Sequence, residues 1–461
     1  MLKDFAIAII QTLRQHGFKA YLAGGCVRDL LLGREPADYD VATSAKPNEV
    51  MEIFPESYAV GAQFGVVLIP SSSVSAPPGL NAVSENQPRP GESHTIEVAT
   101  FRSDHGYTDG RHPDAVHFSE DPREDVLRRD FTINGMMLDP VTLDPLMNGV
   151  LDFVGGRKDL EAGIIRAIGD PEKRFAEDKL RMLRALRFAT RFEYEIEPET
   201  LAAIKRHAHE IRIVSRERVR DEVTRMLIEG HAHRAFLLLD VTGLLSEVLP
   251  EISAMKGVDQ PHEFHPEGDV FVHTLMALDY LPQPCPPTLA WGALLHDVGK
   301  PATFRRGPDR IRFDNHVEVG VKMAEAICKR LRFSRDDTEQ ILALVDNHMR
   351  FGHVRRMKES TLKRFMRLPG FEEHLALHRA DSLASHGNLS TYEFLREKMH
   401  ETPQATIRPA SLVNGDDLIA EGYPPGPKFR EILEAVEDAQ LEGRLQSHDA
   451  ALEYIKREFP L

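Results

Sequence analysis

The spacing of hydrophobic residues divides the chain into an N-terminal part of mixed periodicity and a longer helical part. Residues 1–140 alternate helix-like and strand-like apolar patterns separated by glycine-containing turns, which is typical of α/β segments. From about Pro171 onward, apolar residues recur at the spacing of an amphipathic helix, as at Leu180, Leu183 and Leu186. We therefore expect an α/β head followed by an all-helical remainder.

Polar, proline-containing stretches at 257–268 and 402–409 interrupt the helical pattern and predict further boundaries. Inside the head, residues 70–93 are rich in Ser, Pro, Gly and Asn and have no apolar period. This composition indicates a disordered insertion between two strands, 64–69 and 94–101. The expected domains are a head (1–140), a helical neck that binds RNA and nucleotide (141–250), a histidine-bearing helical domain (257–402) and a helical tail (403–461).

Length and composition describe an ordinary globular protein. The 461 residues, 42% hydrophobic and 28% charged, suffice for several domains with cores of their own. No segment reaches the roughly 20 apolar residues needed to cross a bilayer, and the short apolar run 5–10 lacks a signal-peptide cleavage site. The cysteines Cys26, Cys285 and Cys328 show neither zinc nor disulfide spacing. These features predict a cytoplasmic protein without a membrane segment.

The net charge of −15 is unusual for a protein that binds a polyanion. Arginines gather, however, between Arg174 and Arg191 and again between Arg212 and Arg225. This distribution predicts one basic stripe on an acidic body, with solvated helix faces as the alternative interpretation.

A glycine pair near the N-terminus has the setting of a phosphate-binding turn. Residues 21–23 have the pattern of a strand, Gly24 and Gly25 form the turn, and a helix is expected over 27–32. A glycine turn at a helix N-terminus presents backbone N–H groups that suit a triphosphate. Arg28, in the first helical turn, is placed to donate to phosphate oxygens. A plain tight turn is the alternative.

Two aspartates follow about ten residues later. Strand alternation places Asp38 and Asp40 on one face, with Tyr39 opposite. Adjacent carboxylates repel each other unless a cation lies between them, and hard oxygen ligands suit Mg²⁺. A solvated turn also fits the pair alone, but its position after the glycine turn favours a metal site.

These residues carry a family resemblance. Segments 22–29 (Leu-Ala-Gly-Gly-Cys-Val-Arg-Asp), 31–34 (Leu-Leu-Gly-Arg) and 38–40 (Asp-Tyr-Asp) resemble the signature of class II tRNA nucleotidyltransferases and bacterial poly(A) polymerases. The resemblance extends over nearly the whole chain. It implies a polymerase-β-like nucleotidyltransferase head in which Asp38 and Asp40 hold two Mg²⁺ ions.

The segment 128–134, Arg-Arg-Asp-Phe-Thr-Ile-Asn, is similar to the ribose-reading motif of this family. An aspartate and an asparagine one helical turn apart, Asp130 and Asn134, offer donors and acceptors to a 2′-hydroxyl. An exposed charged helix is the alternative. The resemblance implies that Arg28 and Arg129 hold phosphate and ribose.

The segment 177–181, Glu-Asp-Lys-Leu-Arg, resembles the motif that selects the incoming base. Asp178 as acceptor and Arg181 as donor, three residues apart on a helix, would face the Watson–Crick edge and tell C and A from U and G. An intrahelical salt bridge is the alternative. By resemblance, the residues that bind the nucleotide are Gly25, Arg28, Arg129, Asp178, Arg181, Arg184 and Arg187.

Two further segments bear on the product. Residues 102–111 are similar to the flexible loop that the family needs for the terminal A, and residues 64–67 look like the CCA-adding version of their strand. Glu97, in an alternating strand, is an additional candidate carboxylate. The resemblance thus implies addition of C, C and A to the 3′ end of tRNA, with CTP and ATP as substrates. An A-only-adding enzyme and a poly(A) polymerase are the alternatives.

A second set of candidate ligands lies in the helical part, in the order of HD-family metallohydrolases: His273, His296, Asp297 and Asp381. Imidazole suits transition metals, and an adjacent carboxylate orients metal-bound water. We expect Ni²⁺, Mn²⁺ or Mg²⁺ there, and His316 and His348 as ligands of a second ion. Phosphoester hydrolysis at RNA ends, with the head as an RNA-binding module, is the alternative function. The sequence leaves open whether this site is active and whether the chain is a monomer or a homodimer.

Overall fold

The computed structural model describes residues 2–60, 65–70, 95–106, 115–142, 145–263, 265–308 and 310–461. The chain forms two compact units, one of Met1–Met226 with Arg234–Val248 and one of Leu227–His233 with Leu249–Leu461. Residues 71–93 of the expected insertion, 107–111 of the expected loop and Phe64 lie outside the described residues. In the described part of the chain, no helix combines the length and the apolar character that a membrane span requires.

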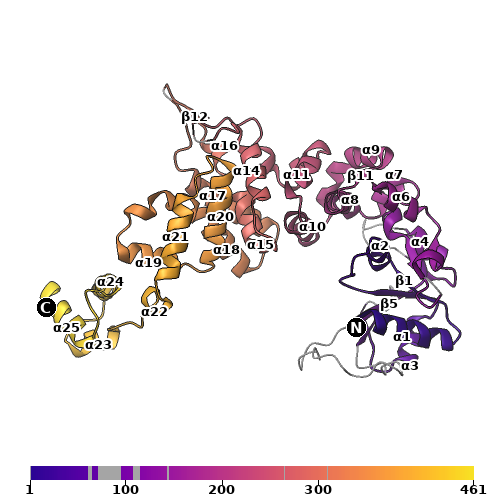
Figure 1. Ribbon diagram of the computed structural model, residues 1–461, viewed down its shortest axis with the longest axis horizontal. Coiled ribbons are helices and arrows are strands. Elements are labelled where there is room, and N and C mark those ends of the chain that lie inside the picture. The colour runs from indigo at the N-terminus through magenta and orange to yellow at the C-terminus, as the bar shows by residue number, and fades with distance from the viewer. Residues whose placement is uncertain are drawn as a thin grey trace. The chain divides into compact units, whose positions relative to one another are not determined.

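A seven-stranded mixed sheet forms the head of the first unit (Figure 1). The strand order is β3-β4-β5-β2-β1-β8-β9. Only β2 and β5 pair in parallel; the other neighbours are antiparallel. The strands are β1 (Ala20–Ala23), β2 (Asp40–Thr43), β3 (Tyr58–Ala59), β4 (Val66–Pro70), β5 (Thr95–Thr100), β8 (Met136–Leu138) and β9 (Val150–Asp152). The predicted α/β head is confirmed.

Apolar side chains at helical spacing attach the first helix, α1 (Leu2–Gln15), to this sheet. Its buried residues include Ile9, Ile10 and Leu13, and it packs on β1, β2 and β5. A separate cluster joins Ala23 and Ala42 of the central strands to Phe101. The remaining helices of the head are α2 (Gly25–Leu31), α3 (Pro47–Ile53), α4 (Pro122–Leu127), α5 (Pro145–Asn148) and α6 (Gly156–Ala162).

The rest of the first unit is mostly helical, as the periodicity predicts. The pattern did not reveal a small parallel pair, β10 (Ile164–Ile165) with β11 (Glu195–Ile196), which brackets two helices. The elements here are α7 (Pro171–Glu177), α8 (Leu180–Arg191), α9 (Pro198–His207), η4 (Ala208–Ile213), α10 (Arg216–Ile228), α11 (Ala232–Val241) and α12 (Leu244–Val248). In α8 the buried residues include Leu183 and Leu186, and its arginines recur every three or four residues, at 181, 184, 187 and 191.

The second unit is built around α15 (Pro287–Leu295), which packs against α14 (Val270–Asp279), α18 (Arg335–Asn347) and α20 (Phe371–Ala384) (Figure 1). Every residue from Leu289 to Leu295 is buried, as expected of a helix that is apolar on all sides. The other elements are α13 (Pro250–Ser253), α16 (Lys300–Thr303), β12 (Arg305–Arg306), β13 (Ile311–Arg312), α17 (His316–Arg330), η5 (His348–Arg356), α19 (Glu359–Met366), α21 (Ser390–Glu401), α22 (Gln404–Ile407), α23 (Gly415–Ala420), α24 (Pro427–Leu441) and α25 (His448–Glu458).

Candidate active site and metal centre

The glycine turn after β1 brings two chain segments into close contact. Gly24 has φ +77°, a conformation that favours glycine, and a Cβ placed on it would lie 2.7 Å from Nη1 of Arg129. Any side chain at Gly24 would therefore displace the arginine. The next residue, Gly25, begins α2, so the turn delivers the chain directly into a helix whose first N–H groups are free of intrahelical partners.

Arg28 of α2 lies almost fully buried, 4% exposed. Its Nη1 donates to Oδ1 of Asn134 at 2.6 Å, and its Nε donates to Oδ1 of Asp29 at 2.8 Å. Its guanidinium also stacks 4.6 Å from the ring centre of Phe192. Burial lowers the pKa of Arg28, while Asp29 opposes that shift. The structure thus holds this side chain rigidly at the edge of the pocket described below.

Asp130 and Asn134 meet, although not on the helix that their spacing predicts. Phe131 is extended, and only the three residues Thr132–Asn134 form a 3₁₀ turn (η3). Asn134 Nδ2 still donates to Oδ1 of Asp130 at 3.1 Å. Both residues are buried, at 7% exposure, so the alternative of an exposed charged helix is wrong. The reason is Phe131, whose fully buried ring anchors the segment in the core.

Arg184 of α8 neutralises Asp130 through two hydrogen bonds to Oδ2, at 2.9 Å from Nε and 2.7 Å from Nη2. Burial would raise the pKa of Asp130, but the charges of Arg184 and Arg181 lower that pKa to about 2. Asp130 is therefore a carboxylate at neutral pH and only accepts hydrogen bonds, two at Oδ2 from Arg184 and two at Oδ1 from Asn134 and the N–H of Phe131.

The two aspartates of the expected metal site lie at the start of β2. Tyr39 is buried while its neighbours Asp38 and Asp40 are exposed, as strand alternation requires, although β2 itself begins only at Asp40. In the parallel register of β2 and β5, Asp40 lies opposite Glu97. The additional carboxylate suggested by the sequence is thus directly beside the pair.

Asp40 is crowded by negative charge. Loss of hydration raises the pKa of Asp40 to about 6, the Glu97 carboxylate adds to the rise, Arg129 opposes it, and Asp38 contributes a smaller rise. A divalent cation would relieve this repulsion, and carboxylate oxygens are its preferred ligands. The donor set at Asp38, Asp40 and Glu97 therefore fits Mg²⁺.

The predicted base-reading pair does not share one helix. Asp178 has extended backbone angles, φ −144° and ψ 106°, and separates α7 from α8. Its Oδ1 accepts a hydrogen bond from the N–H of Leu180 at 3.0 Å, as aspartates at helix starts do. Asp178 pairs with Arg218 instead. The alternative of an intrahelical salt bridge between Asp178 and Arg181 is therefore not found among the described residues.

Arg181 begins the same helix and is held by its own neighbours. Its Nη1 donates to Oε2 of Glu177 at 2.6 Å, and its Nη2 donates to the backbone oxygen of Arg128 at 2.9 Å. Asp178 and Arg181 nevertheless line one cavity.

That cavity, of about 500 Å³, unites most of the residues predicted from the sequence. The predicted residues in its lining are Gly25, Arg28, Asp40, Arg129, Asp178, Arg181, Arg184 and Arg187. Asp38 is not part of the lining. Nine arginines and three aspartates line the cavity, which explains how a chain of net charge −15 can bind a polyanion.

Sequence reasoning did not single out several of these residues. Arg191, Arg218 and Arg225 line the cavity and belong to the two arginine clusters noted above, which was the available signal. Phe188 and Arg128 also line it. Phe188 has the spacing of a core residue, and nothing local distinguishes it from one.

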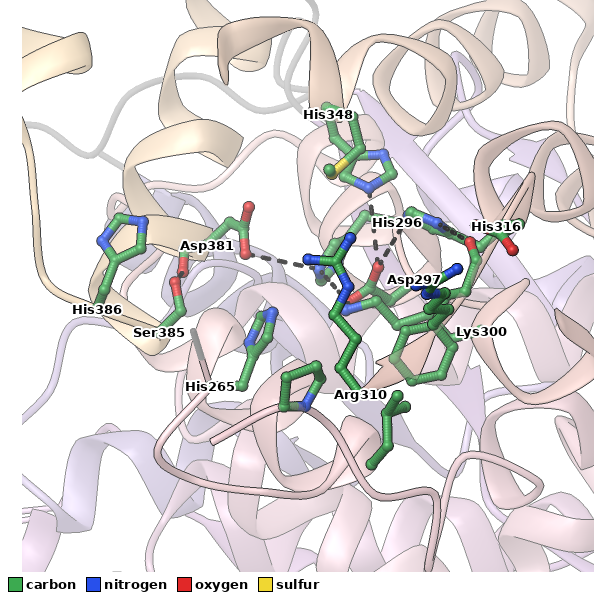
Figure 2. A pocket seen from close by; sticks show the side chains of 16 residues that line it. His265, His296, Asp297, Lys300, Arg310, His316, His348, Asp381, Ser385 and His386 are labelled. Carbon is green, nitrogen blue, oxygen red and sulfur yellow. Dashed lines mark hydrogen bonds and ion pairs between the residues drawn. The ribbon is translucent and has the colours of Figure 1, made fainter. Parts of the chain in front are cut away.

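The second unit holds its own cavity of about 590 Å³, around the HD residues (Figure 2). His273 Nε2 lies 3.1 Å from Oδ1 of Asp381 and 3.3 Å from Nε2 of His296. His296 Nε2 in turn lies 3.2 Å from Oδ2 of Asp297. The four predicted ligands come from two helices, α14 (His273) and α20 (Asp381), and from the turn that ends a third, α15 (His296 and Asp297), and the structure brings all of them together.

Figure 2 shows the rings of His316 and His348 turned toward Asp297. Their Nε2 atoms lie 3.8 Å and 3.7 Å from Oδ1 of Asp297 and are buried without a hydrogen-bond partner. Two sets of potential ligands, each with atoms within 4.8 Å of one another, result: His273, His296 and Asp381, and Asp297, His316 and His348. His273 also belongs to a third such set, with His265 and Glu267.

Backbone carbonyls fix the tautomers of these rings. The Nδ1 atoms of His296, His316 and His348 donate to carbonyl oxygens at 2.7, 2.9 and 2.6 Å. Each ring therefore carries its proton on Nδ1 and directs the lone pair of Nε2 into the cluster, which is how proteins prepare histidine for a metal. These donors fit a transition-metal ion. Among the described residues, the head carboxylates form no comparable group of three ligand atoms within 4.8 Å of one another.

Comparisons with known proteins match three stretches of the chain. Residues 20–166 match the model of the poly A polymerase head domain, residues 193–256 that of the probable RNA and SrmB-binding site of polymerase A, and residues 270–383 that of the HD domain. The CCA-adding enzyme of Geobacillus sp. (strain WCH70) is 32% identical over 446 residues, which cover 96% of this chain and 94% of that protein. The chain belongs to the family of CCA-adding enzymes.

Other members of this family show the same extent of similarity. The CCA-adding enzyme of Lactococcus lactis is 29% identical over 450 residues, covering 96% of this chain and 94% of the relative. The solved structure of the Bacillus stearothermophilus CCA-adding enzyme in complex with CTP has a TM-score of 0.71 and 27% identity, and covers 99% of this chain and 98% of its own. This family requires a divalent metal ion.

Proposed function

We propose that this protein adds C, C and A to the 3′ end of tRNA, with CTP and ATP as substrates and pyrophosphate as the product. The observation that carries the proposal is a single arginine-rich cavity that contains Asp40, the glycine turn and the Asp178–Arg181 pair. Its support is the similarity over nearly the whole chain to CCA-adding enzymes.

In this reaction the tRNA 3′-hydroxyl attacks the α-phosphorus in line. A new bond forms between the 3′-oxygen and phosphorus, the bond to the β-phosphate oxygen breaks, and the hydroxyl proton is lost as pyrophosphate leaves. Asp38 and Asp40 would hold two Mg²⁺ ions, which would neutralise the charge that develops on the phosphate oxygens. No covalent protein intermediate is needed.

The arginines hold the triphosphate and ribose. Gly25 presents backbone N–H groups at the start of α2. Arg28 and Arg129 lie on either side of the glycine turn, and their guanidinium groups suit phosphate and the ribose hydroxyls. Arg184 and Arg187 of α8 complete the positive lining of the cavity.

Base selection follows from hydrogen-bonding pattern. Cytosine and adenine present an amino group beside a ring-nitrogen acceptor, whereas uracil and guanine present a carbonyl beside a ring N–H. Asp178 accepts from the amino group and Arg181 donates to the ring nitrogen. A base with the reversed pattern would meet acceptor against acceptor and donor against donor. The protein surface therefore replaces a template strand.

The expected partners are the 3′ end and acceptor arm of tRNA, together with CTP and ATP. We place the protein in the cytoplasm, where these substrates occur. Its activity in this account requires no membrane, and the chain acts as a monomer or homodimer.

A second candidate function is phosphoester hydrolysis at RNA ends by the HD site. The observation that favours it is that His296, His316, His348, Asp297 and Asp381 line one cavity, with Nε2 of His273 3.3 Å from Nε2 of His296. Ni²⁺, Mn²⁺ or Mg²⁺ would be held by His273, His296, Asp297 and Asp381 and would supply an activated water.

A nucleotide-omission assay tests the main proposal. Purified protein is incubated with tRNA that lacks its terminal C, C and A, in the presence of CTP alone, ATP alone, or both. We expect extension by C residues only with CTP, no extension with ATP alone, and the complete terminus with both. Long A tails with ATP alone would instead identify a poly(A) polymerase, and extension only of tRNA that already ends in C, C would identify an A-adding enzyme.

A further inference from the structure

Arg218 of α10 reaches the aspartate at the junction of α7 and α8 from 40 residues away in the sequence. Its Nη2 donates to Oδ2 of Asp178 at 2.7 Å and its Nη1 donates to Oδ1 at 3.2 Å. The two hydrogen bonds run in parallel from one guanidinium, the geometry that fixes a carboxylate both in position and in the orientation of its plane. Both side chains line the cavity of the head.

One oxygen of the Asp178 carboxylate can accept a further hydrogen bond. Oδ1 accepts from Arg218 and from the N–H of Leu180, at 3.2 and 3.0 Å. A carboxylate oxygen has room for about two such bonds, so Oδ1 is filled. Oδ2 accepts from Arg218 and keeps its second lone pair for a further donor. A base amino group in the cavity is a donor of the right kind.

We propose that Arg218 is a positioning residue for base selection, which holds Asp178 so that Oδ2 meets the amino group of cytosine or adenine. The inference rests on the proposed function and deepens it. It assigns the orientation of the base-reading carboxylate to a long-range contact with α10, outside the helix that carries Arg181.

The physical reason is the freedom of an aspartate side chain. The torsion that turns the carboxylate plane is broad, so Asp178 alone does not define where its lone pairs point. The side chains of Arg218 and Asp178 are only 25% and 17% exposed, which limits competition from water and keeps the pair ordered. Without Arg218, Asp178 would adopt orientations that no longer oppose the carbonyl groups of uracil and guanine.

Arg218→Gln is the direct test, because glutamine keeps a polar side chain but lacks the paired donors of the guanidinium. Arg220→Gln is the matched control. Arg220 lies on the same helix, has the same side-chain exposure of 25%, and pairs with its neighbour Asp221 at 2.8 Å. The incorporation of C into tRNA lacking its terminus is measured at varied CTP and UTP, and circular dichroism checks that each variant is folded.

We expect Arg218→Gln to raise the KM for CTP by about tenfold or more and to lower the preference for CTP over UTP by a similar factor. The rate at saturating CTP should fall by less than about threefold, because Arg218 acts on the base and not on the reacting phosphate. Arg220→Gln should match the wild type. Equal KM values and equal preference in Arg218→Gln and wild type would overturn the inference, as would a loss of rate that is the same for every nucleotide.

A double variant shows whether Arg218 acts through Asp178. In the Asp178→Asn background, Arg218→Gln should cause no further loss of CTP preference, since the carboxylate that it orients is gone. Additive losses would contradict the inference. Arg218→Lys, which keeps the charge but not the fork, should show an intermediate preference. If the wild type adds no C at all, the proposed function fails; if the wild type completes the terminus and Arg218→Gln keeps its selectivity, only the inference fails.

Discussion

Arg187 donates from Nε to Oε2 of Glu222 at 2.6 Å, and the two side chains are only 3% and 5% exposed. This buried pair ties α8 to α10, the helices that supply Arg181 and Arg218 to the cavity. The resemblance assigns Arg187 to nucleotide binding, and it does line the cavity. Because Glu222 belongs to α10, the ion pair of Arg187 also connects α8 to α10.

Removing one member of this pair should destabilise the first unit strongly. Glu222→Ala removes the carboxylate to which the buried Arg187 guanidinium donates, and breaking a buried pair of this kind costs about 3–5 kcal/mol. Trp291 is the only tryptophan and lies in the second unit, so fluorescence does not report on this change. Hydrogen–deuterium exchange of the α8 amides is the suitable measurement, and it should become faster.

The control for that prediction is the double variant Arg187→Met with Glu222→Leu. Apolar side chains of similar size remove both charges together and should restore much of the protection of α8. Unchanged exchange in Glu222→Ala would show that the pair does not support the helix.

His207 predicts a pH-dependent contribution to stability. Its ring nitrogens bond the carboxylates of Glu172 and Glu210. Burial alone would lower the pKa of His207, but the hydrogen bonds to Glu172 and Glu210 raise it above the ordinary value of 6.5. The protonated ring therefore stabilises the fold fully below pH 6.5, and this contribution is lost as pH rises through the pKa of the folded protein.

The corresponding experiment compares melting temperatures of the wild type and His207→Gln between about pH 6 and pH 9. The deficit of the variant should be largest at the acidic end and shrink toward the basic end. His209→Gln changes an exposed histidine two residues away and should show no such trend. A deficit that stays constant with pH would contradict the ion-pair account of His207.

The HD cavity should bind a transition-metal ion independently of the head. Isothermal titration with Ni²⁺ should detect binding to the wild type, and His296→Ala should weaken it by on the order of 100-fold, since a ligand with a fixed tautomer is lost. C addition should be retained in His296→Ala. His386→Ala, which alters the cavity lining outside all three sets of potential ligands, serves as the control. Equal Ni²⁺ affinity in His296→Ala and wild type would remove the HD site from the account.

Local patterns in the sequence predict helices and strands well where the structure depends on residues that are close together in the chain. The apolar spacing of Leu183 and Leu186 identifies α8, and the alternation around Tyr39 orients Asp38 and Asp40 correctly. The order of the histidines also predicts which rings meet in the HD cavity. Each of these signals is contained in a few consecutive residues or in a recognisable order of residues.

Contacts between distant segments were beyond reach of the sequence. The spacing of Asp178 and Arg181 predicts one helix, but an aspartate also caps helices, and here Asp178 accepts from Leu180 N–H and ends the preceding helix. The partners Arg218 and Glu222 come from α10 and leave no local trace. The carbonyl groups that fix the histidine tautomers are likewise set by helix geometry and not by residue type.

The most direct test of the central claim, that the head catalyses nucleotide addition at Asp40, is the incorporation of C by purified Asp40→Asn. The amide keeps the shape of the side chain but loses the charge that attracts the metal ion. Glu35→Gln, which alters only the partner of Tyr39 in the same segment, is the control. We expect Asp40→Asn to fold but to add no C to tRNA, while Glu35→Gln adds it normally; incorporation by Asp40→Asn at the wild-type rate would show that catalysis does not depend on this carboxylate.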